Sequence, residues 1–447
     1  MRSLGGLLKK VLAGFALTAL LPGFARAGEA VASAPIPKID TGDTAWVLMS
    51  AALVFLMTPG LAFFYGGLVR RKNVLSLLMQ CFMIACIISL QWVLFGYSLA
   101  FGPDWKGVIG SLGWAGLSGV GAAPNADYAP TVPHSAFMIF QAMFAVITPG
   151  LIIGAFAERM KFSSFAVFSL LWATLVYDPI CHWVWGVGGF LRGAGALDFA
   201  GGTVVHINAG VAALASALVL GKRLGYPQRI SPPHSLPLAV LGAGLLWFGW
   251  FGFNAGSALG ANGLAAGAFV ATNTAAAAAG FGWAVLDWLF TKRPTMLGMI
   301  TGAVAGLAAV TPAAGYITPM SALFIGVVAA VLCYLSLSYM KVRLGYDDTL
   351  DAFGVHGVSG IWGTIALGIF ATRAVNTAGA DGLIYGNPGL LLIQAKLVLV
   401  TVVYSFTASW VLLKLVDLVM GLRVTEQEEQ IGLDLTQHRE SGYTVLQ

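Results

Sequence analysis

Stretches of about 20 mostly apolar residues, long enough to cross a membrane as α-helices, recur along this chain between residues 45 and 420. Charged residues make up only 10% of the 447 residues, whereas hydrophobic residues make up 58%. A soluble protein of this length needs more charge on its surface, so the solvent around this chain must be largely lipid.

The apolar runs predict an all-α polytopic membrane protein with about eleven transmembrane helices. The expected spans are 44–69, 74–102, 134–156, 162–189, 200–220, 236–258, 262–290, 296–314, 317–340, 351–372 and 389–420. The mature transmembrane domain is expected over residues 28–422, and a polar, acidic tail over residues 423–447.

The first residues are typical of a secretory signal peptide. Arg2, Lys9 and Lys10 form a basic start, an apolar stretch follows, and Ala25-Arg26-Ala27 is a small-x-small sequence. We expect cleavage after about Ala27. The alternative is an uncleaved first helix, which the short apolar run and its Pro22-Gly23 pair disfavour.

The basic residues predict the orientation, because Lys and Arg accumulate in cytoplasmic loops. Those after odd-numbered spans are Arg70, Arg71, Lys72, Arg159, Lys161, Lys222, Arg223, Arg229, Lys292, Arg293, Lys341, Arg343 and Arg423. Those after even-numbered spans are only Lys106, Arg192 and Arg373. We therefore expect the N-terminus outside the cytoplasm and the C-terminus inside, and an exported N-terminus is also what a signal peptide requires.

Spans one to five and six to ten form two blocks, which have opposite orientations because each contains an odd number of spans. The blocks cover about residues 44–220 and 236–372, and the last helix, 389–420, follows them. Each block carries a histidine in its fifth span, followed four residues later by glycine: His206 with Gly210, and His356 with Gly360. An aspartate precedes each histidine by eight residues, at Asp198 and Asp348. This match predicts an inverted repeat with the substrate path between its halves.

Histidine is uncommon inside a membrane span, where ionisable groups usually face a cavity or each other. Because the blocks are inverted, His206 and His356 approach the midplane from opposite sides. Adjacent imidazoles there could hydrogen-bond to each other and pass a proton. The alternative is two unrelated histidines, each bonded to a backbone carbonyl.

Several longer strings resemble the ammonium transporter (Amt/Mep/Rh) family, on its bacterial Amt branch. They are GLIIGAFAERMKF (150–162), HWVWG (182–186), LDFAGGTVVHINAG (197–210), WFGFNAGS (250–257), FGVHGVSG (353–360) and GLRVTEQEEQIGLD (421–434). The resemblance extends from about residue 42 to 443, which is nearly the whole mature chain.

The resemblance implies roles for seven residues. Phe144 and Phe253 correspond to the stacked rings that close the outer end of the pore. Trp185 and Ser257, together with Phe144, correspond to the external site that recruits ammonium. Asp198 corresponds to a buried acid that supports this site without touching the substrate, and His206 and His356 to the twin histidines of the lumen.

The resemblance also implies the setting of the protein. The family forms homotrimers with a pore through each subunit, and its cytoplasmic tail docks a PII-type signal protein. We expect ammonium or ammonia as the substrate, with methylammonium as a further candidate, and the bacterial inner membrane as the location. No cofactor fingerprint, metal-ligand motif or Ser/His nucleophile arrangement is recognisable, so we expect a transporter and not an enzyme.

A bare cation at the middle of a membrane costs at least about 2.5–3.5 kcal/mol. We therefore expect ammonium to lose a proton below the recruitment site, so that ammonia crosses the apolar lumen while His206 and His356 conduct the proton. Two alternatives stay open: an ammonium sensor that signals through a PII-type partner, and an Rh-like neutral ammonia channel. Trp185 and Ser257 favour recruitment of the cation over the neutral channel.

Overall fold

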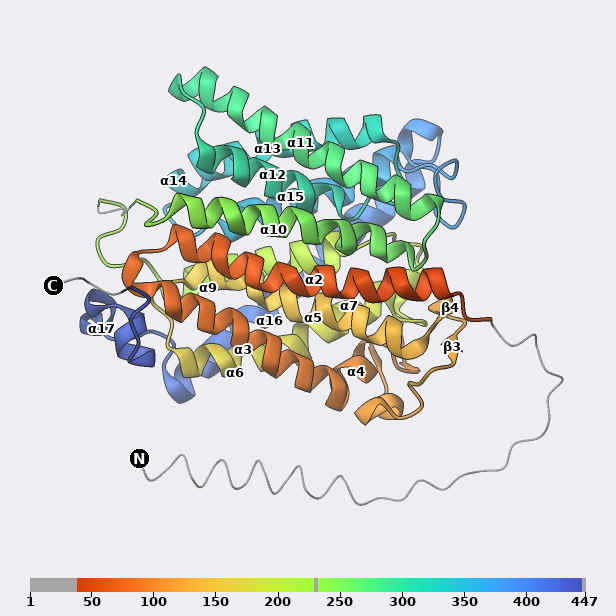
Figure 1. Ribbon diagram of the computed structural model, residues 1–447, viewed down its shortest axis with the longest axis horizontal. Helices are drawn as coiled ribbons and strands as arrows, with labels where there is room; N and C mark the ends of the chain where they lie inside the picture. Colours follow the sequence, from red (N-terminus) through yellow and green to blue (C-terminus); the bar gives the residue numbers. More distant parts are fainter. Residues whose placement is uncertain (1–37, 229–231, 444–447) are drawn as a thin grey trace, which may run out of the picture. The chain divides into compact units, whose positions relative to one another are not determined.

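The computed structural model describes residues 38–228 and 232–443, so the expected signal peptide lies outside the described residues. The described part is a bundle of long helices, as Figure 1 shows. Ten of its helices are long and apolar enough to span a membrane, and α12 (Met296–Val310) is a shorter apolar helix. The all-α polytopic fold with about eleven membrane helices is confirmed.

The first five-helix set corresponds to spans one to five. Its elements are α2 (Thr41–Leu68), α3 (Val74–Gln91) continued by η2 (Trp92–Gly96) and α4 (Tyr97–Phe101), α5 (His134–Phe156), α6 (Phe162–Trp172) continued by η4 (Ala173–Tyr177) and α7 (Asp178–Trp185), and η5 (Gly202–Ile207) continued by α9 (Asn208–Leu220). The short α8 (Phe190–Gly193) lies between α7 and η5.

The second set corresponds to spans six to ten. Its elements are α10 (Leu236–Ala255), α11 (Gly263–Thr291), α12, α13 (Pro319–Leu335) continued by η7 (Ser336–Met340) and α14 (Lys341–Leu344), and η8 (Phe353–Gly357) continued by α15 (Val358–Phe370). The last long helix is α16 (Pro388–Met420). The fourth span of each set contains a π-turn, η4 or η7, and the fifth span of each begins with one, η5 or η8.

One expected span is shorter in the structure. Hydropathy predicts a span over residues 296–314, but its helix ends at Val310. Pro312 lacks a backbone N–H and so cannot donate the next hydrogen bond of the helix, which explains the early end. With 15 residues, α12 is about 22 Å long.

Two short hairpins lie at one end of the bundle, where only loops were expected. Strands β1 (Asp104–Trp105) and β2 (Ile109–Gly110) pair antiparallel, as do β3 (Pro124–Asn125) and β4 (Ala129–Pro133). We call this end the hairpin end. The opposite end, which carries the C-terminal segment, is the tail end (Figure 1).

The tail packs onto the bundle through α17 (Glu426–Ile431) and η10 (Asp434–His438). Glu429 accepts a hydrogen bond from the backbone N–H of Leu224 and pairs with Arg423, each at 2.8 Å. Asp434 accepts a hydrogen bond from the backbone N–H of Ser76 at 2.8 Å. The tail is therefore fixed to the first turn of α3 and to the loop that follows α9.

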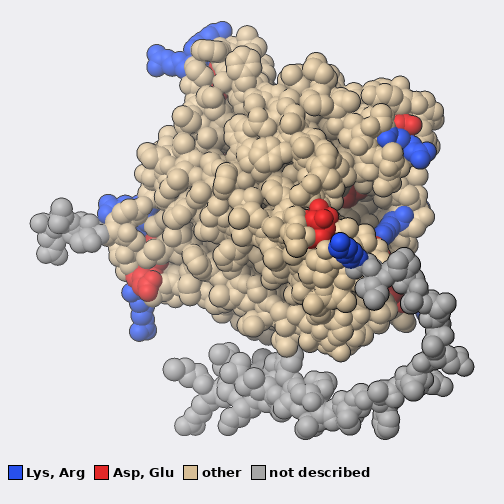
Figure 2. Space-filling model, turned by 45° about the vertical axis from the view of Figure 1, so that its right-hand side comes forward, with Lys and Arg blue, Asp and Glu red and all other residues tan. Residues whose placement is uncertain are grey.

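On the face shown in Figure 2, charged side chains lie toward the two ends, and other residues form the surface between them. This distribution suits a protein whose middle is in contact with lipid, because charged groups in the hydrocarbon layer are costly.

Candidate functional site

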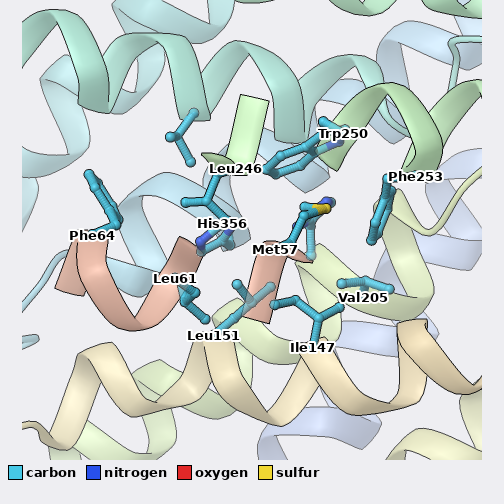
Figure 3. A pocket seen from close by; sticks show the side chains of 12 residues that line it. Met57, Leu61, Phe64, Ile147, Leu151, Val205, Leu246, Trp250, Phe253 and His356 are labelled. Carbon is cyan, nitrogen blue, oxygen red and sulfur yellow. The ribbon is translucent and has the colours of Figure 1, made fainter. Parts of the chain in front are cut away.

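A narrow cavity lies in the interior of the bundle, lined by residues from both five-helix sets (Figure 3). Its lining residues are Met57, Leu61, Phe64, Ile147, Leu151, Val205, His206, Leu246, Trp250, Phe253, Val304 and His356. The cavity volume of about 10 Å³ is roughly what a single water-sized molecule needs. Apart from the two histidines and the indole N–H of Trp250, this lining is apolar.

The structure brings His206 and His356 together in this cavity. Their ring centroids are 5.3 Å apart and the ring planes differ by 12°, so the imidazoles are stacked. Both ring nitrogens of His206 and Nδ1 of His356 are buried without a hydrogen-bond partner. The expected hydrogen bond between the two imidazoles is therefore not formed. The alternative of backbone carbonyl partners is also not observed for these nitrogens.

Close packing of the two histidine-bearing spans explains this meeting. A Cβ atom at Gly210 would overlap the backbone of Gly357, and one at Gly360 would lie 2.9 Å from the carbonyl oxygen of Gly202. Each glycine therefore lets its helix approach the π-turn of the other set. The π-turns η5 and η8 carry His206 and His356 themselves, and such turns are frequent at functional sites.

Trp250 completes the stack and was not among the residues singled out from the sequence. Its indole lies 5.2 Å from the His206 ring at an angle of 18°, so that His206 lies between Trp250 and His356. The indole N–H donates a hydrogen bond to Thr311 Oγ1 at 2.8 Å, which fixes the ring. The three-residue spacing of Trp250 and Phe253 was the available signal, because residues three apart share one helix face.

Aromatic side chains close the cavity toward the hairpin end. The rings of Phe144 on α5 and Phe253 on α10 are 4.3 Å apart and buried. Phe253 lies 5.9 Å from His206, and Phe144 lies 5.9 Å from the partly exposed Trp185 at an angle of 89°. The Phe144–Phe253 pair thus separates Trp185 from the histidines.

Ser257 lies one helical turn beyond Phe253, in η6 (Gly256–Ala258). Its hydroxyl donates a hydrogen bond to the carbonyl oxygen of Phe253 at 2.9 Å. Because its proton is used in this way, the hydroxyl offers only lone pairs to other groups and can act there as an acceptor.

Asp198 is buried just before η5, at the start of the fifth span. Its carboxylate accepts four backbone N–H groups at 2.8–3.1 Å, those of Gly201, Gly202, Thr203 and Val204. Its backbone carbonyl accepts the indole N–H of Trp185 at 2.8 Å. Asp198 therefore orders the entry of the fifth span and also fixes Trp185.

A wider vestibule of about 520 Å³ opens the cavity toward the tail end, and shares Phe64 and His356 with it. Asp348, close to this vestibule, accepts the backbone N–H groups of Ala352 at 3.1 Å and Phe353 at 2.8 Å, which mirrors Asp198. Burial raises the pKa of the Asp348 carboxyl to about 6, while Lys341 opposes this shift and Asp351 adds to it. Lys341 and Asp351 line the vestibule and form an ion pair at 2.6 Å.

Comparisons with known proteins agree with this architecture. The model of the Ammonium Transporter Family matches residues 45–443. The ammonium transporter of Bacillus subtilis (strain 168) is 54% identical over 405 residues, which cover 91% of this chain and 99% of that protein.

Two solved structures are also similar. The crystal structure of Saccharomyces cerevisiae Mep2 has a TM-score of 0.82 at 36% identity, with 87% of this chain and 88% of Mep2 covered. A structure described as a Sensor Amt Protein has a TM-score of 0.82 at 31% identity, with 89% of this chain and 98% of that chain covered. Together with the family match over residues 45–443, these likenesses show that the chain belongs to the ammonium transporter family.

Proposed function

We propose that this chain recruits ammonium at Trp185, Phe144 and Ser257 and conducts ammonia, together with a proton, past His206 and His356. The observation that carries the proposal is a narrow, apolar cavity that contains two stacked imidazoles with unpaired ring nitrogens. A cation finds little solvation in such a lining, whereas neutral ammonia fits its size and polarity.

Recruitment of the cation rests on the aromatic rings and the serine hydroxyl. An aromatic face stabilises a nearby cation by roughly 0.5–2 kcal/mol, and Trp185 and Phe144 offer two faces. Ser257 adds an acceptor for one ammonium proton, since its own proton is bonded to the Phe253 carbonyl oxygen. Asp198 contributes negative charge nearby without contacting the substrate.

The Phe144–Phe253 pair acts as the gate in this proposal. The two rings, with centroids 4.3 Å apart, lie between Trp185 and the cavity. Each passage therefore requires a movement of one or both rings. In the closed position the rings also keep bulk water away from the histidines.

Deprotonation divides ammonium into ammonia and a proton, and the proton passes to an unpaired imidazole nitrogen of His206. Ammonia crosses the cavity, and the proton continues to His356 and the vestibule, so that the net transport is electrogenic. Because no hydrogen bond joins the two imidazoles, proton transfer between them requires a ring rotation or a bridging small molecule. Potassium has no proton to release and is excluded by this step.

We also propose the setting that the family resemblance implies: a homotrimer in the bacterial inner membrane with the hairpin end periplasmic and the tail end cytoplasmic. In this orientation the predicted signal peptide, residues 1–27, is removed outside the cytoplasm. The docked tail and the vestibule beside it form the surface on which a PII-type protein would bind and control the pore.

The likeness to the Sensor Amt Protein favours a second candidate function, ammonium sensing through a partner at the tail end. An Rh-like neutral channel is the third. These candidates differ in the charge and flux that accompany ammonium.

The test uses the full chain in proteoliposomes, with charge movement recorded on an ammonium pulse and a potassium pulse as control. We expect a saturable ammonium current, absent with potassium. Internal alkalinisation without current would support the neutral channel, and neither signal would favour the sensor. His206→Ala should raise the potassium current relative to ammonium, whereas His438→Ala, outside the cavity, should not; unchanged selectivity in His206→Ala would overturn the proton step.

A further inference from the structure

Gln394 on α16 makes an unusual pair of hydrogen bonds inside the bundle. Its side chain is completely buried, and both ends of the carboxamide are used. Oε1 accepts the backbone N–H of Leu197 at 3.0 Å, and Nε2 donates to the backbone carbonyl oxygen of Leu197 at 2.7 Å. Only a side chain with a donor and an acceptor side by side satisfies both groups, and a buried backbone group without a partner is costly.

Leu197 precedes the residue that fixes the recruitment tryptophan. The carbonyl oxygen of Asp198 accepts the indole N–H of Trp185 at 2.8 Å. On the other side, the backbone N–H of Phe199 donates to the carbonyl oxygen of Pro312 at 3.0 Å. The segment 197–199 is thus anchored at both ends, and Gln394 supplies the anchor at the Leu197 end.

Gln394 comes from outside the two five-helix sets that form the pore. Neither its carboxamide nor Leu197 lines the cavity or the vestibule. A contribution of Gln394 to transport must therefore pass through the backbone of Leu197 and Asp198 to Trp185.

We infer that Gln394 is a positioning residue, which sets the affinity for ammonium by holding the Asp198 carbonyl where it fixes the Trp185 indole. This inference rests on the proposed recruitment at Trp185. The last helix then has a defined part in transport, because it stabilises the substrate site although it does not line the pore. The two residues that make this contact, Gln394 and Leu197, are 197 positions apart in the sequence.

The experiment measures KM and maximal ammonium current in proteoliposomes for Gln394→Leu, Trp185→Phe and the double variant. Gln394→Leu removes both hydrogen bonds at similar volume, and Trp185→Phe removes the indole donor. We expect Gln394→Leu to raise KM about tenfold while maximal current changes far less. The double variant should be no worse than the stronger single variant, because both changes break one chain of contacts. Thr401→Val, a buried change on the same helix, should leave KM unchanged.

Gln394→Glu provides a second variant if Gln394→Leu does not fold. A protonated Glu can both accept from and donate to Leu197, whereas an ionised Glu has no donor and faces the carbonyl oxygen. The ratio of the KM of Gln394→Glu to the wild-type KM should therefore be closer to one at about pH 5.5 than at about pH 8.

The outcomes separate this inference from the proposed function. If Trp185→Phe raises KM but neither Gln394 variant does, the recruitment site stands and the positioning role is wrong. Additive effects in the double variant would also exclude it. If Trp185→Phe leaves KM unchanged, both the recruitment site and the inference are overturned.

Discussion

Asp198 illustrates how much a single buried residue does in this protein. Four backbone N–H groups point at its two carboxylate oxygens, and no charged side chain among the described residues is paired with it. Hydrogen bonds to an ionised acceptor are each worth about 1.5–3 kcal/mol, so the carboxylate and the turn that opens η5 stabilise one another.

We predict that Asp198→Asn lowers thermal stability by several degrees and greatly reduces transport. Asparagine replaces one acceptor oxygen by an NH2 group, which would face the N–H groups of Thr203 and Val204 or of Gly201 and Gly202. Melting of the purified protein and ammonium flux in proteoliposomes measure the two effects. Asp127→Asn on the exposed surface is the control, and equal behaviour of the two variants would contradict the prediction.

For individual residues, the sequence could indicate candidates for the functional site but not the contacts that these residues make. Spacing and type were sufficient to single out His206, His356 and Asp198. The stacking of His206 on Trp250, and the two hydrogen bonds between Gln394 and Leu197, depend on which helices pack together. No local pattern encodes such pairs, because the partners are far apart in the chain.

Two pairs of elements, η5 with α9 and η8 with α15, pack closely where the histidines meet. Gly210 and Gly360 remove the side chains that would keep these elements apart. Close helix approach through small residues is a general feature of membrane bundles, where packing replaces the hydrophobic driving force.

We predict that Gly210→Ala destabilises the protein and impairs transport. The added methyl group would overlap the backbone of Gly357, and backbone atoms cannot rotate away as a side chain can. Overpacking of this kind costs about 1–3 kcal/mol. Gly244→Ala on α10 is a matched control, since a Cβ there meets nothing within 4 Å. Thermal melting of both variants should show a loss only for Gly210→Ala.

The elements themselves were largely predictable, because hydropathy over about 20 residues reflects the membrane directly. The π-turns were not, since they depend on tertiary packing. The early end of α12 is indicated by Pro312, which hydropathy alone does not register. Hydropathy also does not predict the short hairpins at the hairpin end, because it carries little information about polar loops.

At the scale of the whole molecule, a charged network joins loops of both five-helix sets at the tail end. Glu158 accepts hydrogen bonds from the backbone and side chain of Arg70 at 2.7–3.0 Å and lies 3.6 Å from Arg223. Arg223 in turn donates to Asp347, a residue of the second set, at 2.8 Å. The network therefore links the loops after α2, α5 and α9 to the segment that precedes η8.

The pKa values of these carboxyls connect the network to pH. Burial alone would raise the pKa of Glu158, but the guanidinium groups of Arg70 and Arg223 outweigh it and hold this pKa below its usual range. For Asp347, burial is outweighed in the same way, chiefly by Arg223. A carboxyl whose pKa is lower in the folded state stabilises it above the unfolded pKa, about 4.3 for Glu. That stabilisation is lost as the pH falls through the folded pKa.

We predict that Glu158→Gln melts several degrees below wild type at about pH 7, and that the two melting temperatures approach each other as the pH falls below about 4.3, the ordinary pKa of Glu. The gap closes because the wild-type carboxyl becomes protonated and loses its attraction to Arg70 and Arg223, a change that glutamine cannot undergo. Melting curves of the purified protein across this pH range measure the gap directly. The control Glu426→Gln, on the exposed side of α17, should have the wild-type melting temperature at every pH in this range. A gap that stays constant down to pH 3 would mean that the ionisation of Glu158 contributes nothing, and that its role is confined to hydrogen bonds that a neutral amide also accepts.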